Sequence, residues 1–211
     1  MQLFWHGYSS IRIEAKNGDQ SCTIITDPFE NESAIRFPRT VESDAVLLSK
    51  EDRYLFNLEG VNGSPFIISR PGEYEVKGVF VNGIKDPKIA EDNIIYRIFA
   101  EGISVAFFGQ LKRRPTNDEL ERLERVDVLM LPVGGGDVMD SSLAAEVISD
   151  IEPRIVVPLY YDLPGLKKSL GNVETFCKHI GSCQRENMNR LKIQQKDLPA
   201  DTMLVAVLER A

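Results

Sequence analysis

The sequence contains only two histidines, His6 and His179, although histidine is the residue type that most often binds catalytic metal ions. A zinc site that needs four or five imidazoles cannot be built from two. His6 lies near the end of an expected strand, where a lone histidine is typically a hydrogen-bonded structural residue. His179 lies two residues from Cys177 on an expected helix, and residues so spaced do not share a helix face. We therefore interpret both as structural or surface residues.

Other residue types offer further chemistry. Ser9–Ser10 and Ser141–Ser142 have no paired histidine base, so a serine triad is not expected. Gly134–Asp137 has the composition of a phosphate-binding loop, but no helix follows at once, which favours a tight turn. Asp27 follows a strand, where a carboxylate usually makes a structural hydrogen bond. The remaining possibility is an acidic cluster of Asp27, Asp52 and Glu73.

The three cysteines, Cys22, Cys177 and Cys183, are odd in number, widely spaced and without a Cys-x-x-Cys pair. Such a set is typical of free thiols in a reducing compartment. The N-terminal residues lack the basic and apolar segments of a secretory signal, and no run of about 18 apolar residues exists. The sequence therefore predicts a cytoplasmic protein with no membrane partner.

The chain has 211 residues, of which 43% are hydrophobic and 27% are charged. This predicts a single domain over residues 1–211, or at most two closely packed half-domains, with a sizeable core. The net charge of −7 repels nucleic acid phosphates, and the basic clusters are short enough to be solvated surface. We therefore expect no nucleic acid partner. The basic clusters are Lys112–Arg114, Lys167–Lys168 and Arg185–Lys192.

Short apolar runs separated by Gly, Pro, Asn and Asp predict strands in both halves of the chain. Alternation over Ile11–Glu14 favours a half-exposed antiparallel strand, whereas the apolar run Val128–Leu131 favours a buried one. The expected strands are Gln2–His6, Ile11–Ala15, Cys22–Thr26, Ala45–Leu48, Phe66–Ser69, Tyr74–Val81, Ile94–Ala100, Ser104–Phe108, Val128–Leu131, Arg154–Pro158 and Met203–Glu209.

Helices are expected mainly in the second half, where residues that cap helix N-termini precede suitable segments. Strands with helices packed outside them predict an α/β sandwich of two sheets. The expected helices are Asn117–Arg125 after a Thr116/Glu119 capping box, a segment ending at Ile151 after Asp140 or Ser141, Val173–Ile180 after Asn172, and Glu186–Leu191.

Six segments follow one another in a distinctive order: Phe4–Ser10, Thr26–Phe29, Ala45–Ser49, Pro71–Val76, Val128–Gly135 and Pro153–Tyr161. Together they resemble the metallo-β-lactamase superfamily over nearly the whole chain, and within it the small hydrolases similar to ascorbate-6-phosphate lactonase. The resemblance implies an αββα sandwich, two mixed β-sheets flanked by helices, with a dinuclear metal site at the edge between the sheets. Zinc in such a site lowers the pKa of a bound water to about 7.

The positions where this resemblance implies metal ligands carry other residues. The Ser-His-x-His-x-Asp-His loop of the family aligns with Ser49–Leu55. Its Gly-Asp-Leu and its final strand-end histidine align with Gly109–Leu111 and Tyr160. Among the substitutes only Asp52 can ligate a metal, so we expect neither metal nor cofactor. The six aligned residues are Lys50, Asp52, Tyr54, Leu55, Gln110 and Tyr160.

Strand ends at one edge of a sheet are where functional side chains gather. We therefore expect one cleft formed by Lys50, Asp52, Tyr54, Gln110 and Tyr160. The family's carboxylates are replaced by neutral Tyr54 and Gln110, so the Lys50 ammonium would supply the positive charge that metal supplied. We expect it within direct or water-bridged reach of Asp52 or a phenol oxygen.

The interpretation that follows is a non-catalytic protein on a hydrolase fold. It would bind a small-molecule ligand in the former metal cleft, or assemble with itself or with a related protein. The alternative is a hydrolase with altered or metal-independent chemistry on a small ester or phosphorylated metabolite. In that case Lys50, Asp52 and Tyr160 would be the acid–base groups.

Overall fold

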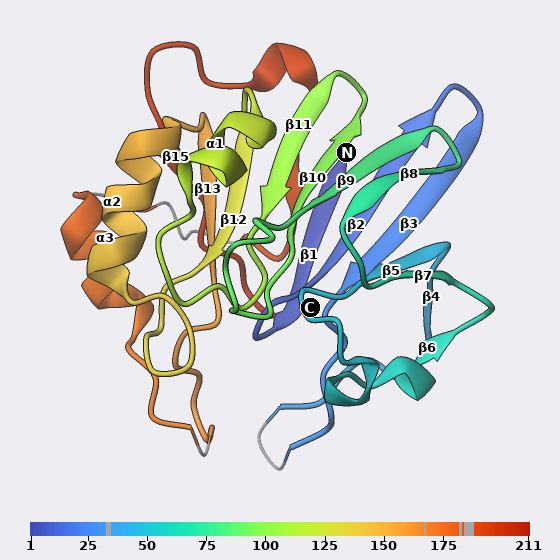
Figure 1. The fold of residues 1–211 in the computed structure, drawn as a ribbon, viewed down its shortest axis with the longest axis horizontal. Helices are drawn as coiled ribbons and strands as arrows, with labels where there is room; N and C mark the ends of the chain where they lie inside the picture. The colour runs from blue at the N-terminus through green and yellow to red at the C-terminus, as the bar shows by residue number, and fades with distance from the viewer. Residues whose placement is uncertain (33–34, 167, 182, 184–187) are drawn as a thin grey trace.

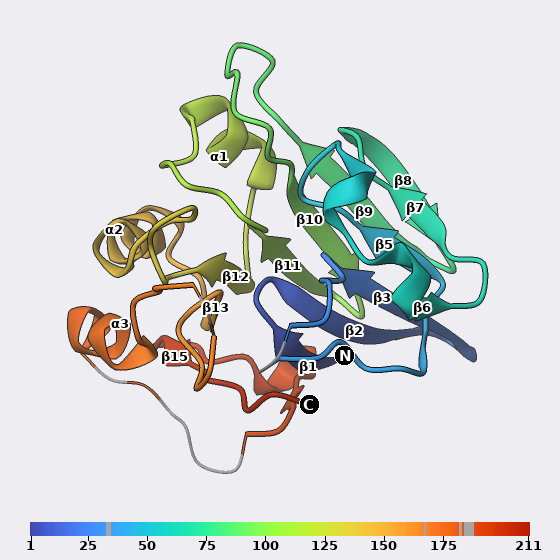
Figure 2. The same ribbon diagram turned by 90° about the horizontal axis from the view of Figure 1, so that it is seen from below.

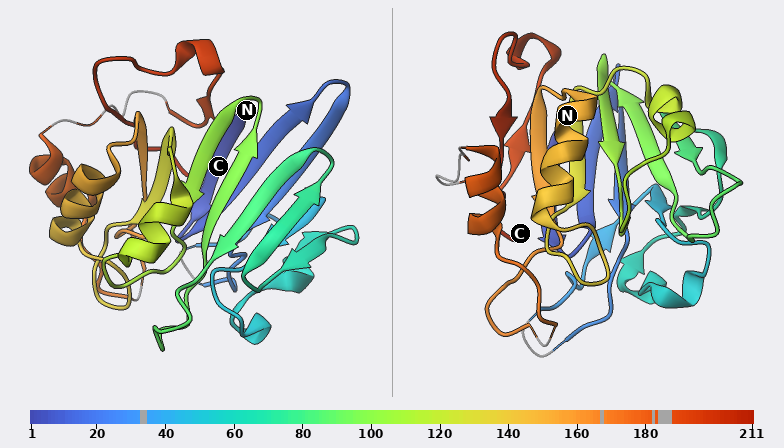
Figure 3. Two further views of the ribbon diagram at one scale, coloured as in Figure 1. Left: turned by 45° about the horizontal axis from the view of Figure 1, so that its top comes forward. Right: turned by 60° about the vertical axis from the view of Figure 1, so that its left-hand side comes forward.

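The computed structural model describes residues 1–32, 35–166, 168–181, 183 and 188–211. Two large β-sheets pack face to face in it, as Figure 1 shows. Helices α1 (Asn117–Leu123) and α2 (Ser141–Ile151) cover the outer face of one sheet, and α3 (Val173–Ile180) packs against α2 (Figures 2 and 3). This confirms the predicted sandwich of two mixed sheets with helices outside. No helix among the described residues is long and apolar enough to cross a membrane.

The six-stranded sheet has the order β14-β1-β2-β3-β5-β7. Strands β1 to β3 are antiparallel neighbours, whereas β5 and β7 run parallel to β3. Its strands are β1 (Gln2–Gly7), β2 (Ser10–Asn17), β3 (Gln20–Thr26), β5 (Ala45–Leu47), β7 (Phe66–Ile68) and β14 (Leu191–Lys192). A separate parallel pair consists of β4 (Val41–Glu42) and β6 (Val61–Asn62).

The seven-stranded sheet has the order β15-β13-β12-β11-β10-β9-β8. From β11 to β15 all neighbours are parallel, so these strands all end at the same edge. Its strands are β8 (Gly72–Val76), β9 (Val79–Ile84), β10 (Ile95–Ala100), β11 (Ile103–Phe107), β12 (Val128–Pro132), β13 (Ile155–Leu159) and β15 (Leu204–Val205).

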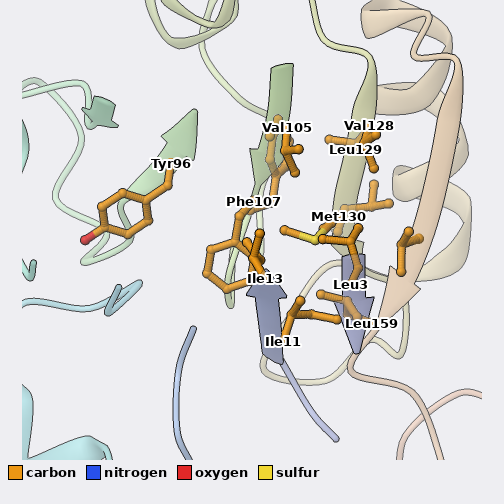
Figure 4. Close-up of a cluster of buried hydrophobic side chains, with 14 of the residues drawn as sticks. Leu3, Ile11, Ile13, Tyr96, Val105, Phe107, Val128, Leu129, Met130 and Leu159 are labelled. Atoms are coloured by element: carbon orange, nitrogen blue, oxygen red, sulfur yellow. The ribbon is translucent and has the colours of Figure 1, made fainter. Parts of the chain in front are cut away.

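The core lies between the two sheets. Leu3, Ile11 and Ile13 of the first sheet face Phe107 and Met130 of the second, as Figure 4 shows, and all five are fully buried. Burial of each such side chain contributes roughly 1.5–3 kcal/mol. The continuous apolar strands β11 to β13 are buried on both faces, as expected for parallel strands under helices.

Loops cover part of the outer face of the six-stranded sheet, and within the described ranges no α-helix lies over it. Ile35 and Phe37 are buried there, and the Phe37 ring meets His6 edge to face with ring centroids 5.8 Å apart. Gly7 permits this close packing, because a Cβ at that position would lie 2.2 Å from Ile35 Cδ1. Apolar loop residues therefore shield this part of the six-stranded sheet from solvent, as α1 and α2 shield the outer face of the seven-stranded sheet.

Three predicted elements differ from the structure in more than their end residues. The expected strand Tyr74–Val81 is the hairpin β8–β9, because Lys77 and Gly78 both adopt positive φ in a two-residue turn. Met203–Glu209 pairs with β13 only at β15, since the chain then crosses to β1, where Ala211 N–H donates to Trp5 O. For the expected helix Glu186–Leu191, residues 186 and 187 lie outside the described residues, and the rest is not helical.

The other helices begin as predicted. Both halves of the Thr116/Glu119 capping box are formed, and Asp140 and Asn172 cap α2 and α3. Helix α1 ends at Leu123 and not at Arg125, because Glu124 adopts a positive φ.

The expectation of three free thiols is wrong for two of them. Cys177 and Cys183 form a disulfide, with their Cα atoms 5.5 Å apart. Gly181 ends α3 with a φ of +98°, and the chain beyond the helix returns to within reach of Cys177. Cys22 is free and buried.

Candidate functional site

Strands β3 and β5 of one sheet and β11 and β13 of the other end at the same edge of the sandwich, next to the β1–β2 turn. Residues that follow these strands surround a pocket of about 420 Å³, which we call the strand-edge pocket. Asp27, Gln110 and Tyr160 are held by the ends of buried strands, which gives this part of the pocket a rigid support, and loop residues complete the lining. Its lining is Tyr8, Ser9, Asp27, Phe29, Glu30, Glu32, Lys50, Leu55, Phe56, Gln110, Asp137, Tyr160 and Lys168.

Of the six aligned residues, four meet in this pocket: Lys50, Leu55, Gln110 and Tyr160. The other two, Asp52 and Tyr54, line a neighbouring hollow of about 700 Å³, and Tyr54 is 99% exposed. The expected convergence of five residues therefore holds for three of them. Leu55, the sixth aligned residue of the predicted former metal site, also lines this pocket.

The separation of Asp52 from Lys50 has a local cause. The Asp52 carboxylate accepts a hydrogen bond from Tyr54 N–H and caps the short 3₁₀ helix η1 (Arg53–Leu55), which turns Tyr54 outward. The Lys50 ammonium instead donates to the main-chain oxygen of Asp92 at 2.9 Å. We expected Lys50 to reach Asp52 or a phenol oxygen, directly or through water; in the part of the chain that the structure describes it contacts neither directly, and a main-chain carbonyl is its observed partner.

Asp27 lies at the bottom of the pocket and is almost fully buried. Its carboxylate accepts hydrogen bonds from Ser9 Oγ at 2.8 Å, from Ser49 N at 2.7 Å and from Ser49 Oγ at 2.6 Å. Burial raises the pKa of Asp27 to about 6, although these donors and the charge of Lys50 oppose the rise. The predicted structural hydrogen bond at this strand end is confirmed.

Two aromatic rings, of Tyr8 and Tyr160, and the side chain of Lys168 also line the strand-edge pocket. The rings of Tyr8 and Tyr160 have centroids 5.0 Å apart, and Lys168 Nζ lies 3.1 Å from the Tyr160 hydroxyl and 3.9 Å from an Asp137 oxygen. The Tyr8 hydroxyl donates to Glu32 at 2.9 Å. Sequence reasoning assigned Lys168 to solvated surface, since a lysine in a loop gives no local signal of where that loop folds.

Strained backbone marks the pocket. Tyr8, Asp27 and Tyr160 have φ angles of 48°, 36° and 52°, a region that non-glycine residues seldom adopt. The other non-glycine residues with positive φ, at positions 77, 101, 124 and 152, lie in hairpin turns or at helix ends. Strain that is not required by a turn or a cap tends to occur at functional sites. Tyr8 lies in the two-residue β1–β2 turn, so only Asp27 and Tyr160 have strain that no turn or cap requires, and these two residues support a functional role for this pocket.

The glycine run at 134–136 forms a tight turn, as expected. Gly135 N–H donates to Met139 O, and Gly134 bridges to Asp140. Gly134 also packs closely against the main chain of Tyr160: a Cβ at position 134 would lie 2.2 Å from the main-chain oxygen of Tyr160.

Replacing Gly134 with alanine is expected to lower the free energy of unfolding by about 1–3 kcal/mol and to displace Tyr160. Chemical denaturation measures the first effect, and the second is measured by the amide chemical shifts of Tyr160 and of Gly171, whose N–H donates to Gly134 O. Gly136→Ala is the matched control: nothing lies within 4 Å of its Cβ position, and only its φ of +71° is unfavourable. Unmoved Tyr160 and Gly171 resonances in the Gly134 variant would contradict the expected contact.

Neither histidine contributes to the pocket. His6 is buried against Phe37, and the Ala211 main chain is the polar group that acts on its ring. His179 lies on the surface of α3, where Nδ1 is 3.1 Å from Ser141 Oγ. Glu73 does not line the pocket either, so the acidic cluster of Asp27, Asp52 and Glu73 is not formed.

The residues present do not fit a zinc centre. Among the described residues, no group of three His, Cys, Asp or Glu side chains is placed to hold a metal ion. Zinc requires three or four such ligands. In the strand-edge pocket, the Asp27 carboxylate accepts hydrogen bonds from two serine hydroxyls, and the Glu32 carboxylate accepts one from the Tyr8 hydroxyl.

The fold and this edge site define the class of protein. The family model described as the beta-lactamase superfamily domain matches residues 2–160, and the chain belongs to this family. It is 24% identical over 198 residues to a "UPF0173 metal-dependent hydrolase" of Lysinibacillus sphaericus, covering 77% of this chain and 86% of the relative. A UPF0173 protein of Pyrococcus furiosus is 26% identical over 192 residues, covering 76% and 83%.

Solved structures agree with this assignment. A proposed Zn-dependent hydrolase of the metallo-beta-lactamase superfamily from Thermotoga maritima superposes with a TM-score of 0.82 and 28% identity, covering 98% of each chain. A metallo hydrolase from Ignicoccus hospitalis has a TM-score of 0.62 at 17% identity, covering 85% of this chain and 90% of its own, and this similarity concerns the fold alone. These matches do not confirm the finer resemblance to ascorbate-6-phosphate lactonase.

Proposed function

We propose that this protein binds a small molecule in the strand-edge pocket and does not perform zinc-dependent hydrolysis there. The observation that carries the proposal is the chemistry of the pocket. The two packed sheets place Lys50, Gln110 and Tyr160 around it, the loop after β13 adds Lys168, and no imidazole lines it. A ligand there would meet ammonium, amide, phenol and carboxylate groups together with the apolar Leu55 and Phe56. Such a lining suits recognition of a small polar molecule.

The alternative, a hydrolase that works without a metal, has one specific observation in its favour. Lys168 donates toward the Tyr160 oxygen at 3.1 Å, which leaves the phenol proton free to be donated to a bound molecule. Tyr160 would then be the general acid. The name of the Lysinibacillus relative also favours hydrolysis, although that protein is named for a metal-dependent reaction.

Metal content and activity test the proposal together. Protein purified without chelator is expected to carry well under one zinc per chain, because the pocket offers no clustered ligands. Hydrolysis of ester, lactone and β-lactam substrates is expected to stay at background with and without added zinc. Tightly held stoichiometric zinc by elemental analysis would refute the proposal. Zinc-independent hydrolysis that Tyr160→Phe abolishes would establish the alternative.

The same proposal includes assembly of the chain with itself or with a related protein. Tyr54 and Leu55 support it, because they are 99% and 55% exposed beside the pocket mouth and place apolar surface where a second chain would cover it.

A further inference from the structure

A second pocket lies at the opposite edge of the seven-stranded sheet, where strands β11, β12 and β13 begin. Ser104 lies in β11, Asp127 directly precedes β12 and Arg154 directly precedes β13. The side chains of Arg97 and Arg125 join Arg154 around a hollow of about 200 Å³. Since Gln110 and Tyr160 follow the other ends of β11 and β13, this arginine pocket is separate from the strand-edge pocket.

One carboxylate is shared between two of the arginines, and neither contact is short. Arg125 Nε and Arg154 Nε lie 3.7 Å and 3.8 Å from the same oxygen of Asp127. Hydrogen bonds between guanidinium and carboxylate groups measure about 2.7–2.9 Å, so these two attractions are electrostatic only. The other Asp127 oxygen accepts from Ser104 N–H at 3.0 Å, which fixes the carboxylate in place. Among the described residues, neither side chain donates a hydrogen bond, and their N–H groups remain available.

The third arginine has its own partners. Arg97 pairs with Glu124 at 2.9 Å and donates to Ser104 Oγ at 3.2 Å. Three guanidinium groups therefore face two carboxylates, which leaves a local surplus of positive charge on a chain of net charge −7. The Phe99 ring, 41% exposed, forms an apolar wall of the same hollow.

We propose that the arginine pocket binds one oxyanion group, a phosphate or a carboxylate, carried by a small molecule. Arg125 and Arg154 would hold it through their unused N–H groups, since guanidinium donors match planar and tetrahedral oxyanions. The volume of about 200 Å³ suits a single anionic group and not a large ligand. This proposal does not depend on the function of the strand-edge pocket.

Titration of the full chain with inorganic phosphate and with acetate, followed by calorimetry and by the amide shifts of Ser104 and Asp127, tests the proposal. Saturable binding of either probe is expected, and the preferred probe identifies the type of oxyanion. R125A and R154A are each expected to weaken binding about tenfold or more, because each removes charge-assisted hydrogen bonds. Arg125 has a side chain 70% exposed, so its variant should remain folded.

D127N gives the sharper result. An asparagine oxygen can still accept from Ser104 N–H, but the carboxylate that competes with the anion is gone, so binding should tighten several-fold. R114A is the matched control, because Arg114 pairs on the surface with Asp150 and Glu146, and phosphate binding should not change. Absence of saturation with either probe overturns the proposal. So does equal affinity in the wild type, R125A and R154A, or binding by D127N that is no tighter.

Discussion

Glu119→Ala is expected to lower the free energy of unfolding by about 2–4 kcal/mol, because it leaves Arg113 with Glu91 as its remaining carboxylate and leaves the Thr116 and Asp86 N–H groups without their acceptor. The Glu119 side chain is fully buried, with its two oxygens 2.7 Å from the two terminal nitrogens of Arg113. The same oxygens accept from Thr116 N–H at 2.9 Å and from Asp86 N–H at 3.3 Å. One residue thus caps α1, pairs with Arg113 and anchors the loop after β9.

Urea denaturation at neutral pH measures this loss. Glu121→Ala is the matched control on the same helix, and its exposed side chain should change stability by no more than about 0.5 kcal/mol. Arg113→Ala and the double variant complete a mutant cycle. Because both substitutions break the same pair, the double variant should lose much less stability than the sum of the two. A loss below about 1 kcal/mol for Glu119→Ala would show that water compensates the pair, contrary to its burial.

Asp27→Asn is expected to make the protein far more sensitive to acid, and His6→Leu far less. Burial raises the pKa of Asp27 to about 6, so between its unfolded value of 3.8 and pH 6 the folded state holds an extra proton. The contribution of Asp27 therefore stabilises the fold as the pH falls through that window and is lost as the pH rises. Its size is about 3 kcal/mol.

His6 acts in the opposite sense. Burial and the nearby Arg12 charge lower its pKa from 6.5 to about 4, although the Ala211 main chain opposes the change. The unfolded chain binds the proton first, so stability falls as the pH falls from 6.5 to about 4, again by about 3 kcal/mol. In the wild type the two contributions nearly cancel over this range.

Stability curves from pH 7 to pH 4 for the wild type and the two variants test this balance. Relative to the wild type, Asp27→Asn should lose about 3 kcal/mol on acidification and His6→Leu should gain about as much. The other carboxylates titrate alike in all three proteins, so the differences report the two residues alone. Parallel curves for the wild type and Asp27→Asn would mean that Asp27 keeps an ordinary pKa in the folded protein.

Several parts of the candidate site were predictable only in outline. The sequence placed Lys50, Gln110 and Tyr160 after three strands, and the packing of the two sheets brings the ends of these strands to one edge of the sandwich. It did not predict that Asp52 would cap η1, which directs Tyr54 into solvent. An aspartate side chain can accept a hydrogen bond from any of several nearby backbone N–H groups, and the residue types alone do not specify which of them it binds.

The sequence by itself determined the features that are local or compositional. The capping residues Thr116, Asp140 and Asn172 start their helices because each bonds to N–H groups within three residues. Two histidines cannot form an imidazole cluster in any fold. The ordered segments from Phe4–Ser10 to Pro153–Tyr161 were sufficient to predict the superfamily, which the family model confirms.

Only the tertiary structure decided which distant residues meet. Lys168 joins Tyr8 and Tyr160, and Asp27 joins Ser9 and Ser49, across many positions of sequence. The disulfide of Cys177 needs a chain reversal beyond α3, which residue spacing does not specify. Sequence patterns report the preferences of residues that are neighbours along the chain. The contacts between distant residues, and the burial that raises the pKa of Asp27, arise from sheet packing and from the paths of loops between strands.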